Sequence, residues 1–391
     1  MDDSEKNEYI PYGLHAVSEE DILAVNDVLR NKQLTQGKKV NEFENAISKR
    51  VNANYCIALN SATSALHLSC LALGVSTNDI VWTSPISFVA SANCALYCGA
   101  KIDFVDINPS TGLLDIDYLK SKLKKASINN CLPKVIIPVH LAGSSCDMEE
   151  IYNLSKIYNF SIIEDASHAI GGKYKKTMVG SCTYSSITVF SFHPVKIITT
   201  GEGGAVTTND KKIAERITCL RSHGIVKDPK DFINPQPGSW NYEQQYLGFN
   251  YRITDIQAAL GLSQLGRLEK IVKERNYQLA FYKEILDGLP LSILDIPKEN
   301  YSSVHLAVIR LETSSKSYYL RVFEGLKSKN IGVQLHYKPI YKNPYFKKFN
   351  FNERLFPGAE EYESTSISIP LFPNLKKEQQ IRIKNTLLSL L

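Results

Sequence analysis

The sequence predicts an α/β protein with two domains: a large one built on a mostly parallel, seven-stranded sheet, and a smaller C-terminal α+β domain. Two observations predict this. Apolar runs alternate with helical patterns from about residue 50 to 220, which is typical of a parallel sheet with helices on both faces. Beyond residue 275, predicted strands and helices follow one another without the regular alternation of the first part of the chain. The length of 391 residues allows both domains. We place them at 15–265 and 266–391, and expect residues 1–14 to pack on the second.

Seven short apolar runs have the length and residue types of strands. They are Tyr55–Leu59, Ile80–Trp82, Lys101–Val105, Val135–Val139, Phe160–Glu164, Ser186–Ser191 and Gly204–Thr208. Helical patterns lie between most of them, for example at Ser64–Leu73 and Met148–Tyr158. Only about a dozen residues join the last two strands, and they include Lys196. We therefore expect this lysine on a loop at the edge of the sheet.

Asp255–Arg275 is predicted to form one long helix that joins the two domains, with Thr254 in position to cap its N-terminus. The C-terminal domain is expected to contain two further strands and two helices. These are the strands Ser302–Leu311 and Val333–Leu335 and the helices Ser317–Lys329 and Lys376–Leu390. Pro, Asn and Tyr are frequent between residues 339 and 357, which predicts an irregular loop there.

Composition excludes several classes of protein. The net charge is +5 and no run of five like charges occurs, so we expect no nucleic-acid partner. A mild positive charge is compatible with a small anionic substrate. No stretch approaches 18 uncharged apolar residues, so no membrane span is expected. The first residues, MDDSEKNEYIPYG, are polar and acidic and do not resemble a signal peptide, so a cytoplasmic protein is expected.

The eight cysteines all lie in the first 220 residues and form no Cys-x-x-Cys pair. Zinc ribbons and thioredoxin-like chemistry are therefore not expected. Several of these cysteines lie inside apolar runs, where a free cysteine behaves as a small buried hydrophobic residue.

Two segments indicate chemistry. EDASHAIGG (164–172) places carboxylates after one apolar run, and SFHPVKIITTGEGG (191–204) places Lys196 after another, before a glycine-rich turn. A lysine amine condenses with aldehydes, and an acidic partner keeps a pyridine nitrogen protonated, so this pair is typical of a pyridoxal phosphate site. The alternative is an ordinary surface lysine, which the apolar neighbours Val195 and Ile197 argue against.

The carboxylate partner is either Glu164 or Asp165. Both come at the end of a strand, where open α/β sheets bind their ligands. Side chains alternate along a strand, so only one of the two can face a ligand.

A third segment, NSATS at 60–64, joins a strand to a helix through small residues. Such a turn exposes backbone N–H groups at a helix N-terminus and can bind an anion. Many α/β proteins contain turns of this kind, so the segment by itself does not identify the ligand.

These segments, extended to NSATSAL (60–66) and joined by LGFNYRITDIQAA (247–259), resemble the DegT/DnrJ/EryC1/StrS family of sugar aminotransferases. The likeness runs from about residue 10 to about 375. It implies the fold of pyridoxal-phosphate-dependent transferases of the aspartate aminotransferase type (fold type I), with pyridoxal 5'-phosphate as the cofactor. The resemblance selects Asp165 over Glu164 as the partner of the pyridine nitrogen.

The resemblance also implies roles for further residues. Lys196 would bind the cofactor and carry protons, while the backbone of Ala62 and Thr63 and the hydroxyl of Ser191 would hold its phosphate. Asn250 would reach the same phosphate from the neighbouring subunit, which implies a homodimer with shared active sites.

Phe88 resembles the aromatic residue that stacks on the cofactor ring, although an isolated phenylalanine is more often an ordinary core residue. His168 lies three residues after Asp165. It would orient Asp165 or contact the cofactor, or else it is a core histidine with satisfied hydrogen bonds.

The resemblance implies L-glutamate as the amino donor and a nucleotide-linked keto sugar as the acceptor. The segments WTSP (82–85), SANCALYCGA (91–100) and EQQ (243–245) resemble family members that aminate C4 of a UDP-linked 4-keto-6-deoxy-N-acetylhexosamine. The tracts around Glu202, His223 and Tyr242 are expected to be substrate-side loops. LHYKPIY (335–341), which is basic and aromatic, is expected to approach the sugar nucleotide.

Three alternatives remain at this stage. The same fold can act on another nucleotide sugar, linked to dTDP or GDP. A sugar dehydratase of this family carries histidine where this chain has Lys196, so that activity is disfavoured. A regulatory or DNA-binding protein would not need Lys196 and would show basic clustering, which is absent from the sequence.

Overall fold

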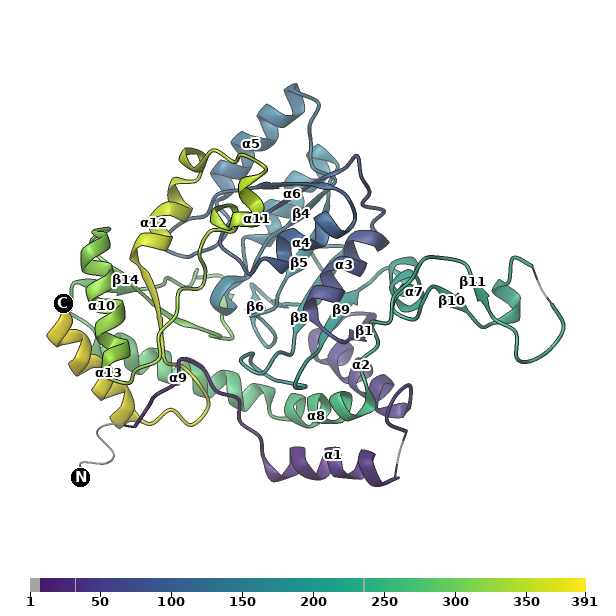
Figure 1. Ribbon diagram of the computed structural model, residues 1–391, viewed down its shortest axis with the longest axis horizontal. Coiled ribbons are helices and arrows are strands. Elements are labelled where there is room, and N and C mark those ends of the chain that lie inside the picture. Colours follow the sequence, from purple (N-terminus) through teal and green to yellow (C-terminus); the bar gives the residue numbers. More distant parts are fainter. Residues whose placement is uncertain (1–7, 32, 235) are drawn as a thin grey trace.

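A computed structural model describes residues 8–31, 33–234 and 236–391 (Figure 1). Its centre is a seven-stranded sheet with the order β1-β9-β8-β5-β4-β2-β3. The strands are β1 (Tyr55–Leu59), β2 (Ile80–Thr83), β3 (Lys101–Phe104), β4 (Val135–Ile137), β5 (Ser161–Asp165), β8 (Ile187–Ser191) and β9 (Gly204–Thr208). All pairs are parallel except those of β9, which is antiparallel to both β1 and β8. The expected α/β fold with a mostly parallel seven-stranded sheet is confirmed.

Alternation along the strands buries both faces of this sheet. Ile57 and Leu59 of β1 belong to one apolar cluster, whereas Ala58 between them belongs to another. The first cluster contains side chains of α3 (Ala62–Ala72), α4 (Ala90–Tyr97), α5 (Ile116–Ile128), α6 (Met148–Tyr158) and α7 (Lys211–Leu220). The second contains side chains of α2 (Lys38–Val51) and α8 (Asp255–Gly266). Helices therefore cover both faces, as the strand–helix alternation predicts.

The single long helix expected over 255–275 is wrong. The structure has two helices, α8 and α9 (Leu268–Ile285), separated at Arg267, whose φ of −103° and ψ of 5° depart from helical values. Gly266 precedes the break, and glycine is a poor helix former. The N-terminal cap at Thr254 is confirmed: its hydroxyl accepts a hydrogen bond from Gln257 N (3.2 Å), and Gln257 Oε1 accepts one from Thr254 N (3.0 Å).

A three-stranded antiparallel sheet lies toward the C-terminus, with β14 (Ala307–Leu311) between β12 (Leu291–Ile293) and β15 (Ser366–Ile369). Its apolar cluster includes side chains of α9, α10 (Lys316–Ser328) and α13 (Lys377–Leu390), and also Ile10. Ile10 N donates to Asn330 O (2.9 Å), and Gly332 N donates to Ile10 O (2.7 Å). The chain near residue 10 thus packs on this part of the molecule, while residues 1–7 of the expected N-terminal segment lie outside the described residues.

Three local expectations in this region are wrong. The strand expected at 302–311 begins only at Ala307, because the preceding segment turns through Val304 at a φ of +50°. The strand expected at 333–335 is reduced to one bridge between Gln334 and Ser368. The expected irregular loop at 339–357 contains three short helical turns. They are η4 (Ile340–Lys342), α11 (Pro344–Lys347) and η5 (Glu353–Leu355).

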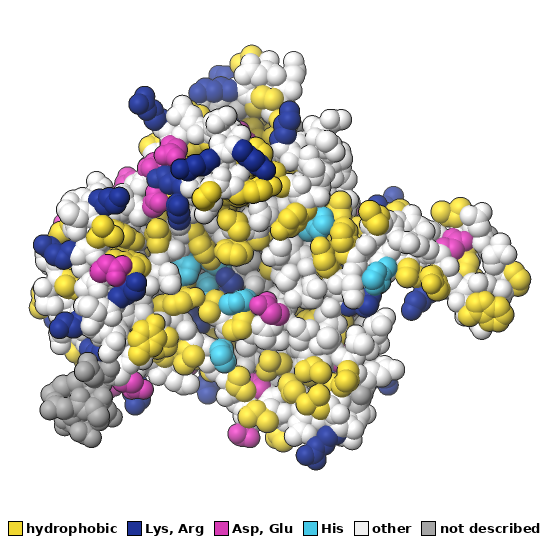
Figure 2. All heavy atoms as spheres, viewed as in Figure 1, with side chains coloured by type: hydrophobic (Ala, Val, Ile, Leu, Met, Phe, Trp, Pro, Cys, Tyr) yellow, Lys and Arg dark blue, Asp and Glu magenta, His cyan; other side chains and the backbone are white. Residues whose placement is uncertain are grey.

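The remaining elements are peripheral. They are α1 (Glu19–Asn31), α12 (Pro357–Thr365), the turns η2 (Leu141–Gly143) and η3 (Pro229–Asp231), and a small sheet of β13 (Asn300–Tyr301), β6 (Lys173–Tyr174) and β7 (Thr177–Met178). An arm around the hairpin of β10 (Ile225–Val226) and β11 (Glu243–Gln244) projects from the body (Figure 1). Its large apolar side chains Ile233, Trp240 and Leu247 are exposed, and apolar atoms gather on the arm in Figure 2.

All eight cysteines are free. Cys70, Cys94, Cys146 and Cys182 are buried, as expected, whereas Cys131 is exposed. No helix in the described ranges combines the length and the hydropathy that crossing a membrane requires. Within the same ranges no group of histidine, cysteine and acidic side chains is arranged to hold a metal ion.

Candidate active site

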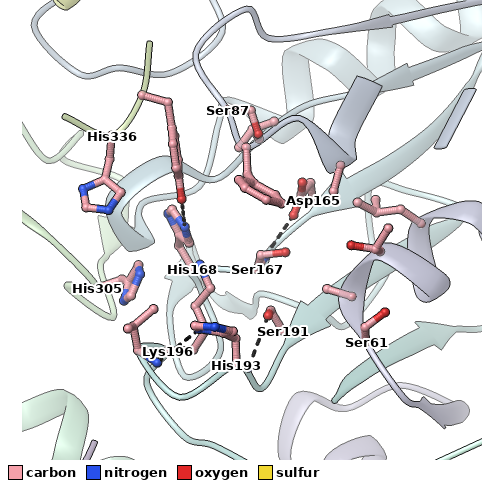
Figure 3. Close-up of a pocket in the computed structure, with 18 of the residues that line it drawn as sticks. Ser61, Ser87, Asp165, Ser167, His168, Ser191, His193, Lys196, His305 and His336 are labelled. Atoms are coloured by element: carbon pink, nitrogen blue, oxygen red, sulfur yellow. Dashed lines mark hydrogen bonds between the residues drawn. The ribbon is translucent and has the colours of Figure 1, made fainter. Parts of the chain in front are cut away.

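A cavity of about 430 Å³ lies at the carboxyl ends of β5 and β8 (Figure 3). Its wall comes from distant parts of the chain: residues near 12, 61–66, 87–90, 139, 165–168, 191–202, 305 and 336–337. The cavity brings together seven of the eight site residues expected from the sequence. They are Ala62, Thr63, Phe88, Asp165, His168, Ser191 and Lys196. In an open α/β sheet this is the edge at which ligands bind.

Lys196 lies on the loop between β8 and β9. Phe192 anchors both ends of that loop, because its N donates to Gly203 O (2.9 Å) and its O accepts from Thr200 N (3.0 Å). Burial lowers the pKa of Lys196 to about 8, and the negative charge of Asp165 opposes this shift only in part. An appreciable fraction of the amine is therefore neutral and nucleophilic near neutral pH.

Asp165 ends β5 and faces the cavity. Its Oδ2 accepts a hydrogen bond from Ser91 Oγ (2.6 Å), and its Oδ1 accepts one from Ser167 N (3.2 Å). These contacts fix a buried carboxylate.

Glu164 does not line the cavity. Its Oε2 lies 2.7 Å from His140 Nε2, and its Oε1 accepts hydrogen bonds from Thr188 Oγ1 (3.0 Å) and Ser185 Oγ (2.5 Å). The choice between neighbouring carboxylates thus follows from strand alternation, and Asp165 is the one that a ligand in the cavity would meet.

The turn before α3 offers unpaired donors. Ser61 caps the helix by accepting a hydrogen bond from Ser64 N (3.0 Å). The N–H groups of Ala62 and Thr63 have no acceptor among the described residues. A Cβ at Gly204 would lie 2.5 Å from Ala62 N, so only glycine allows β9 to pass this close to the turn. The turn is a well-formed anion site.

Phe88 is 59% exposed although it belongs to a buried part of the chain. Its ring centroid lies 6.3 Å from that of Tyr337, across the cavity wall. An aromatic face left open toward a cavity is available for stacking on a flat ligand.

His168 is held from both sides. Its Nδ1 accepts a hydrogen bond from Ala142 N (3.3 Å), and its Nε2 lies 3.2 Å from the hydroxyl of Tyr337. Burial and the charge of Lys196 lower its pKa well below the usual range, so the ring is neutral. Because Ala142 N donates to Nδ1, the ring proton resides on Nε2. Among the described residues, Ser91 and Ser167, not His168, orient Asp165.

Sequence reasoning missed Ser91 and His305 as individual site residues. Ser91 lay inside a segment noted only for its resemblance. His305 lay in an expected strand and gave no sign of a function. The ring centroid of His305 is 4.3 Å from that of His168. His336 and Tyr337, expected near the sugar nucleotide, line the cavity.

Asn250 does not line the cavity of its own chain. It is exposed at the base of the arm, where its backbone O accepts a long hydrogen bond from Asn60 Nδ2 (3.5 Å). Of the expected substrate-side loops, Glu202 lines the cavity, whereas His223 and the tract from Tyr242 do not. A contribution of Asn250 to another subunit stays a prediction.

These residues fit pyridoxal phosphate. Unpaired N–H groups and Ser191 form an anion site, Asp165 supplies a fixed carboxylate, Phe88 presents an open ring, and Lys196 has a lowered pKa. A phosphate, a pyridine nitrogen, a flat ring and an aldehyde require this set of partners.

Comparisons with known proteins agree with a pyridoxal phosphate site. The model of the DegT/DnrJ/EryC1/StrS aminotransferase family matches residues 15–388. A UDP-4-amino-4,6-dideoxy-N-acetyl-beta-L-altrosamine transaminase of Campylobacter jejuni is 40% identical over 383 residues, 98% of this chain and 97% of that protein. The structure is also similar to that of PseC from Helicobacter pylori, an aminotransferase involved in the biosynthesis of pseudoaminic acid (TM-score 0.89, 33% identity, 98% and 99% of the two chains). A third similar structure is the PLP-form of the putative sugar aminotransferase Spr1654 from Streptococcus pneumoniae (TM-score 0.87, 28% identity, 98% and 100%).

Proposed function

Because the chain belongs to the DegT/DnrJ/EryC1/StrS aminotransferase family and is a pyridoxal-phosphate-dependent sugar aminotransferase, we propose that it aminates C4 of a UDP-linked 4-keto-6-deoxy-N-acetylhexosamine. L-Glutamate is the proposed donor. The product is UDP-4-amino-4,6-dideoxy-N-acetyl-β-L-altrosamine, an intermediate of pseudaminic acid biosynthesis. The observation that carries the proposal is 40% identity, along nearly the whole chain, to a transaminase named for that product.

The residues of the cavity have distinct parts in this reaction. When bound, pyridoxal phosphate supplies an electron sink for the charge that develops at the reacting carbon. The N–H groups of Ala62 and Thr63 and the hydroxyl of Ser191, which line the cavity, would hold its phosphate. Asp165, fixed by Ser91 and Ser167, would face the pyridine nitrogen with its carboxylate.

Lys196 carries the proton between the two ends of the reaction. A pKa of about 8 would let the amine accept a proton from the donor's Cα and release it at a second carbon near neutral pH. Its loop is tied by backbone hydrogen bonds at both ends, so the backbone that carries this lysine is held beside the cavity.

The wall around His336 and Tyr337 supports the sugar-nucleotide part of the proposal. These two residues of the segment LHYKPIY line the cavity, and the cation of Lys338 follows them directly in the chain. A basic and aromatic segment suits a diphosphate and a sugar ring.

A homodimer with shared sites is part of the proposal. Asn250 lies outside its own cavity, and the adjoining arm exposes Trp240 (79%) and Leu247 (83%). Large apolar side chains exposed together on one projection favour contact with another protein surface. A second copy of the chain is the partner that the proposed role of Asn250 requires.

The main alternative is an aminotransferase that acts on a dTDP- or GDP-linked 4-keto sugar. The cavity residues named above serve amine transfer in general and do not distinguish the nucleotide. A dehydratase is disfavoured because Lys196 occupies the position at which histidine would be expected.

The test separates the two halves of the reaction. L-Glutamate added to the holoenzyme should shift the cofactor's absorption band, and the UDP-linked 4-keto-6-deoxy-N-acetylhexosamine of the L-arabino configuration should restore it. Product NMR then identifies an amine at C4. A Lys196→Ala enzyme is the control and should contain no borohydride-trappable link between protein and cofactor. Faster discharge onto a dTDP- or GDP-linked keto sugar would refute the substrate and leave the aminotransferase.

A further inference from the structure

His305 is a buried histidine whose hydrogen-bonding capacity is unused. It is 4% exposed and lines the cavity, and its Nδ1 is buried with no hydrogen-bond partner among the described residues. An unsatisfied polar atom in the interior is costly, so native proteins retain one mainly where it has a use. Because Nδ1 is buried, the ring atom that can meet a ligand in the cavity is Nε2, which also has no hydrogen-bond partner among the described residues.

The neighbouring histidines are already engaged. His168 uses both ring nitrogens, with Ala142 N and the Tyr337 hydroxyl as partners. His336 Nδ1 lies 2.8 Å from Ser368 Oγ. His168, His305 and His336 gather on one side of the cavity in Figure 3, away from Ser61 and Asp165. His305 is therefore the histidine on that side with neither ring nitrogen bonded to a described residue.

The cations that act on His305 are Lys196 and Arg275, and the cavity wall also carries the carboxylates of Asp165 and Glu202. Lys196 is the only lysine or arginine that lines the cavity in the described part of the chain. Behind the wall, Arg275 is fully buried and forms no ion pair with a described residue; its guanidinium donates to the backbone O atoms of Val304 and His305 (both 3.3 Å) and Leu371 (3.4 Å). Burial lowers the pKa of Arg275 only to about 10, so it stays charged at neutral pH. An anion in this half of the cavity is therefore attracted.

An amino-acid donor brings a carboxylate into the cavity, where Lys196 is assigned to the cofactor and proton transfer. No guanidinium lines the described wall to receive that carboxylate. An imidazole N–H can donate to it, and the bond gains strength because the acceptor is charged.

We propose that His305 binds a carboxylate of the amino-acid donor, on the side of the cavity opposite the phosphate turn. This inference rests on the proposed function, because it takes the donor to be a dicarboxylic amino acid. His305 would contact the donor in the first half of the reaction and the corresponding 2-oxo acid before its release.

The test measures equilibrium binding to the holoenzyme with glutarate, which has the carboxylates of the donor but no amine. Isothermal titration should detect glutarate but not the neutral diamide glutaramide. In His305→Phe the affinity for glutarate should fall about tenfold to hundredfold, the range for a hydrogen bond to a charged group. The control is His67→Phe, a buried histidine of α3 outside the cavity, which should bind glutarate as the unsubstituted enzyme does.

Stability separates a ligand contact from a structural role. Since neither nitrogen of His305 has a partner in the described structure, His305→Phe should melt at the same or a higher temperature. A large drop in the melting temperature of His305→Phe would show a structural role and overturn the inference. In that case His305→Asn, which keeps a polar side chain, should bind glutarate as the unsubstituted enzyme does.

Other outcomes are equally decisive. Unchanged glutarate affinity in His305→Phe, or no binding to the unsubstituted enzyme, would overturn this inference. Neither result depends on the sugar. An enzyme that binds glutarate through His305 but aminates no UDP-linked sugar refutes the proposed acceptor alone.

Discussion

Lys196 is a cation held where the protein has removed much of its water. The carboxylate of Asp165 favours the charged amine, yet burial has the larger effect and the pKa falls to about 8. The unfolded chain returns the amine to its ordinary pKa near 10.5. This difference couples the stability of the cofactor-free protein to pH through one side chain.

Lys196→Met should therefore stabilise the cofactor-free protein below pH 8. At those pH values the buried lysine is charged in both states and destabilises the folded one, by at most about 3 kcal/mol for a shift of this size. Between pH 8 and 10.5 the unfolded chain binds more protons than the folded one, so the stability contributed by Lys196 rises with pH. Urea unfolding of both proteins at pH 7 and pH 10 measures the effect. If the difference in unfolding free energy between the two proteins is no smaller at pH 10 than at pH 7, the prediction is contradicted.

Asp165→Asn should preserve the fold and lower turnover by about a hundredfold to a thousandfold, because it removes the carboxylate proposed to face the pyridine nitrogen. Ser91→Ala is the matched control. It removes the 2.6 Å hydrogen bond to Asp165 but leaves the charge, so its effect should be smaller, about tenfold. Steady-state kinetics compare the two. Near-normal turnover in Asp165→Asn would mean that another acid holds the nitrogen.

Among the elements, the turn before α3 and the start of β9 depend on each other. The N-terminus of α3 can present free N–H groups because β9 begins with a glycine directly beneath it. A side chain at that position would meet backbone atoms, which cannot move aside as a flexible side chain would.

Gly204→Ala should therefore weaken cofactor binding by tenfold or more, since the added Cβ would lie 2.5 Å from Ala62 N and 2.6 Å from Ser61 O. Titration of the cofactor-free protein with pyridoxal phosphate measures the affinity. Gly266→Ala is the matched control, because nothing lies within 4 Å of the corresponding Cβ and alanine favours the helix. Equal affinities in the two variants would show that the close approach does not shape the site.

Short-range pattern predicted the elements that local residues determine. The seven strands are correct because each is a compact apolar run, and Met148–Tyr158 agrees with α6 at both ends. The helix over 255–275 was wrong because its apolar pattern continues through Gly266 and Arg267, while the break lies in a backbone turn that the pattern does not contain. The positive φ of Val304, a β-branched residue, is likewise invisible to propensity.

The residues of the site likewise divide into those that local sequence predicts and those that it does not. Lys196, Asp165 and the turn at 61–63 come from short segments with their own chemistry, so the sequence placed them in one cavity. His305 is brought beside His168 by packing between regions more than a hundred residues apart, and no local sequence pattern predicts that contact. The roles assigned to the individual site residues, including Asn250, stay predictions. The domain boundary between residues 265 and 266 also stays a prediction.

At the scale of the whole molecule, one chain does not contain every residue assigned to a site. Asn250 follows the projecting arm (Figure 1) in the chain, pairs with Ser222 before the arm, and does not line the cavity of its own chain. The proposed homodimer would supply it from the other chain.

Mixed dimers test this arrangement. Lys196→Ala combined with Asn250→Ala should recover activity, up to one intact site per heterodimer, if each variant is inactive alone and subunits exchange. Lys196→Ala combined with Asp165→Ala should recover none, because both residues line the cavity of one chain. Verified heterodimers of the first kind that remain inactive would assign Asn250 to its own chain.

The pairing of β1 with β9 has a consequence for the order of folding. Leu59 lies opposite Gly204 in that ladder, so the turn before α3 and the loop that carries Lys196 meet only when segments 145 positions apart have paired. Contacts so distant along the chain form slowly, because closing a long loop costs entropy before any contact compensates it. Helices and local strand pairs can form earlier, but the cofactor has no complete site until this ladder closes. Cofactor binding therefore requires a late step of folding, and a chain in which this ladder has not closed lacks the complete site.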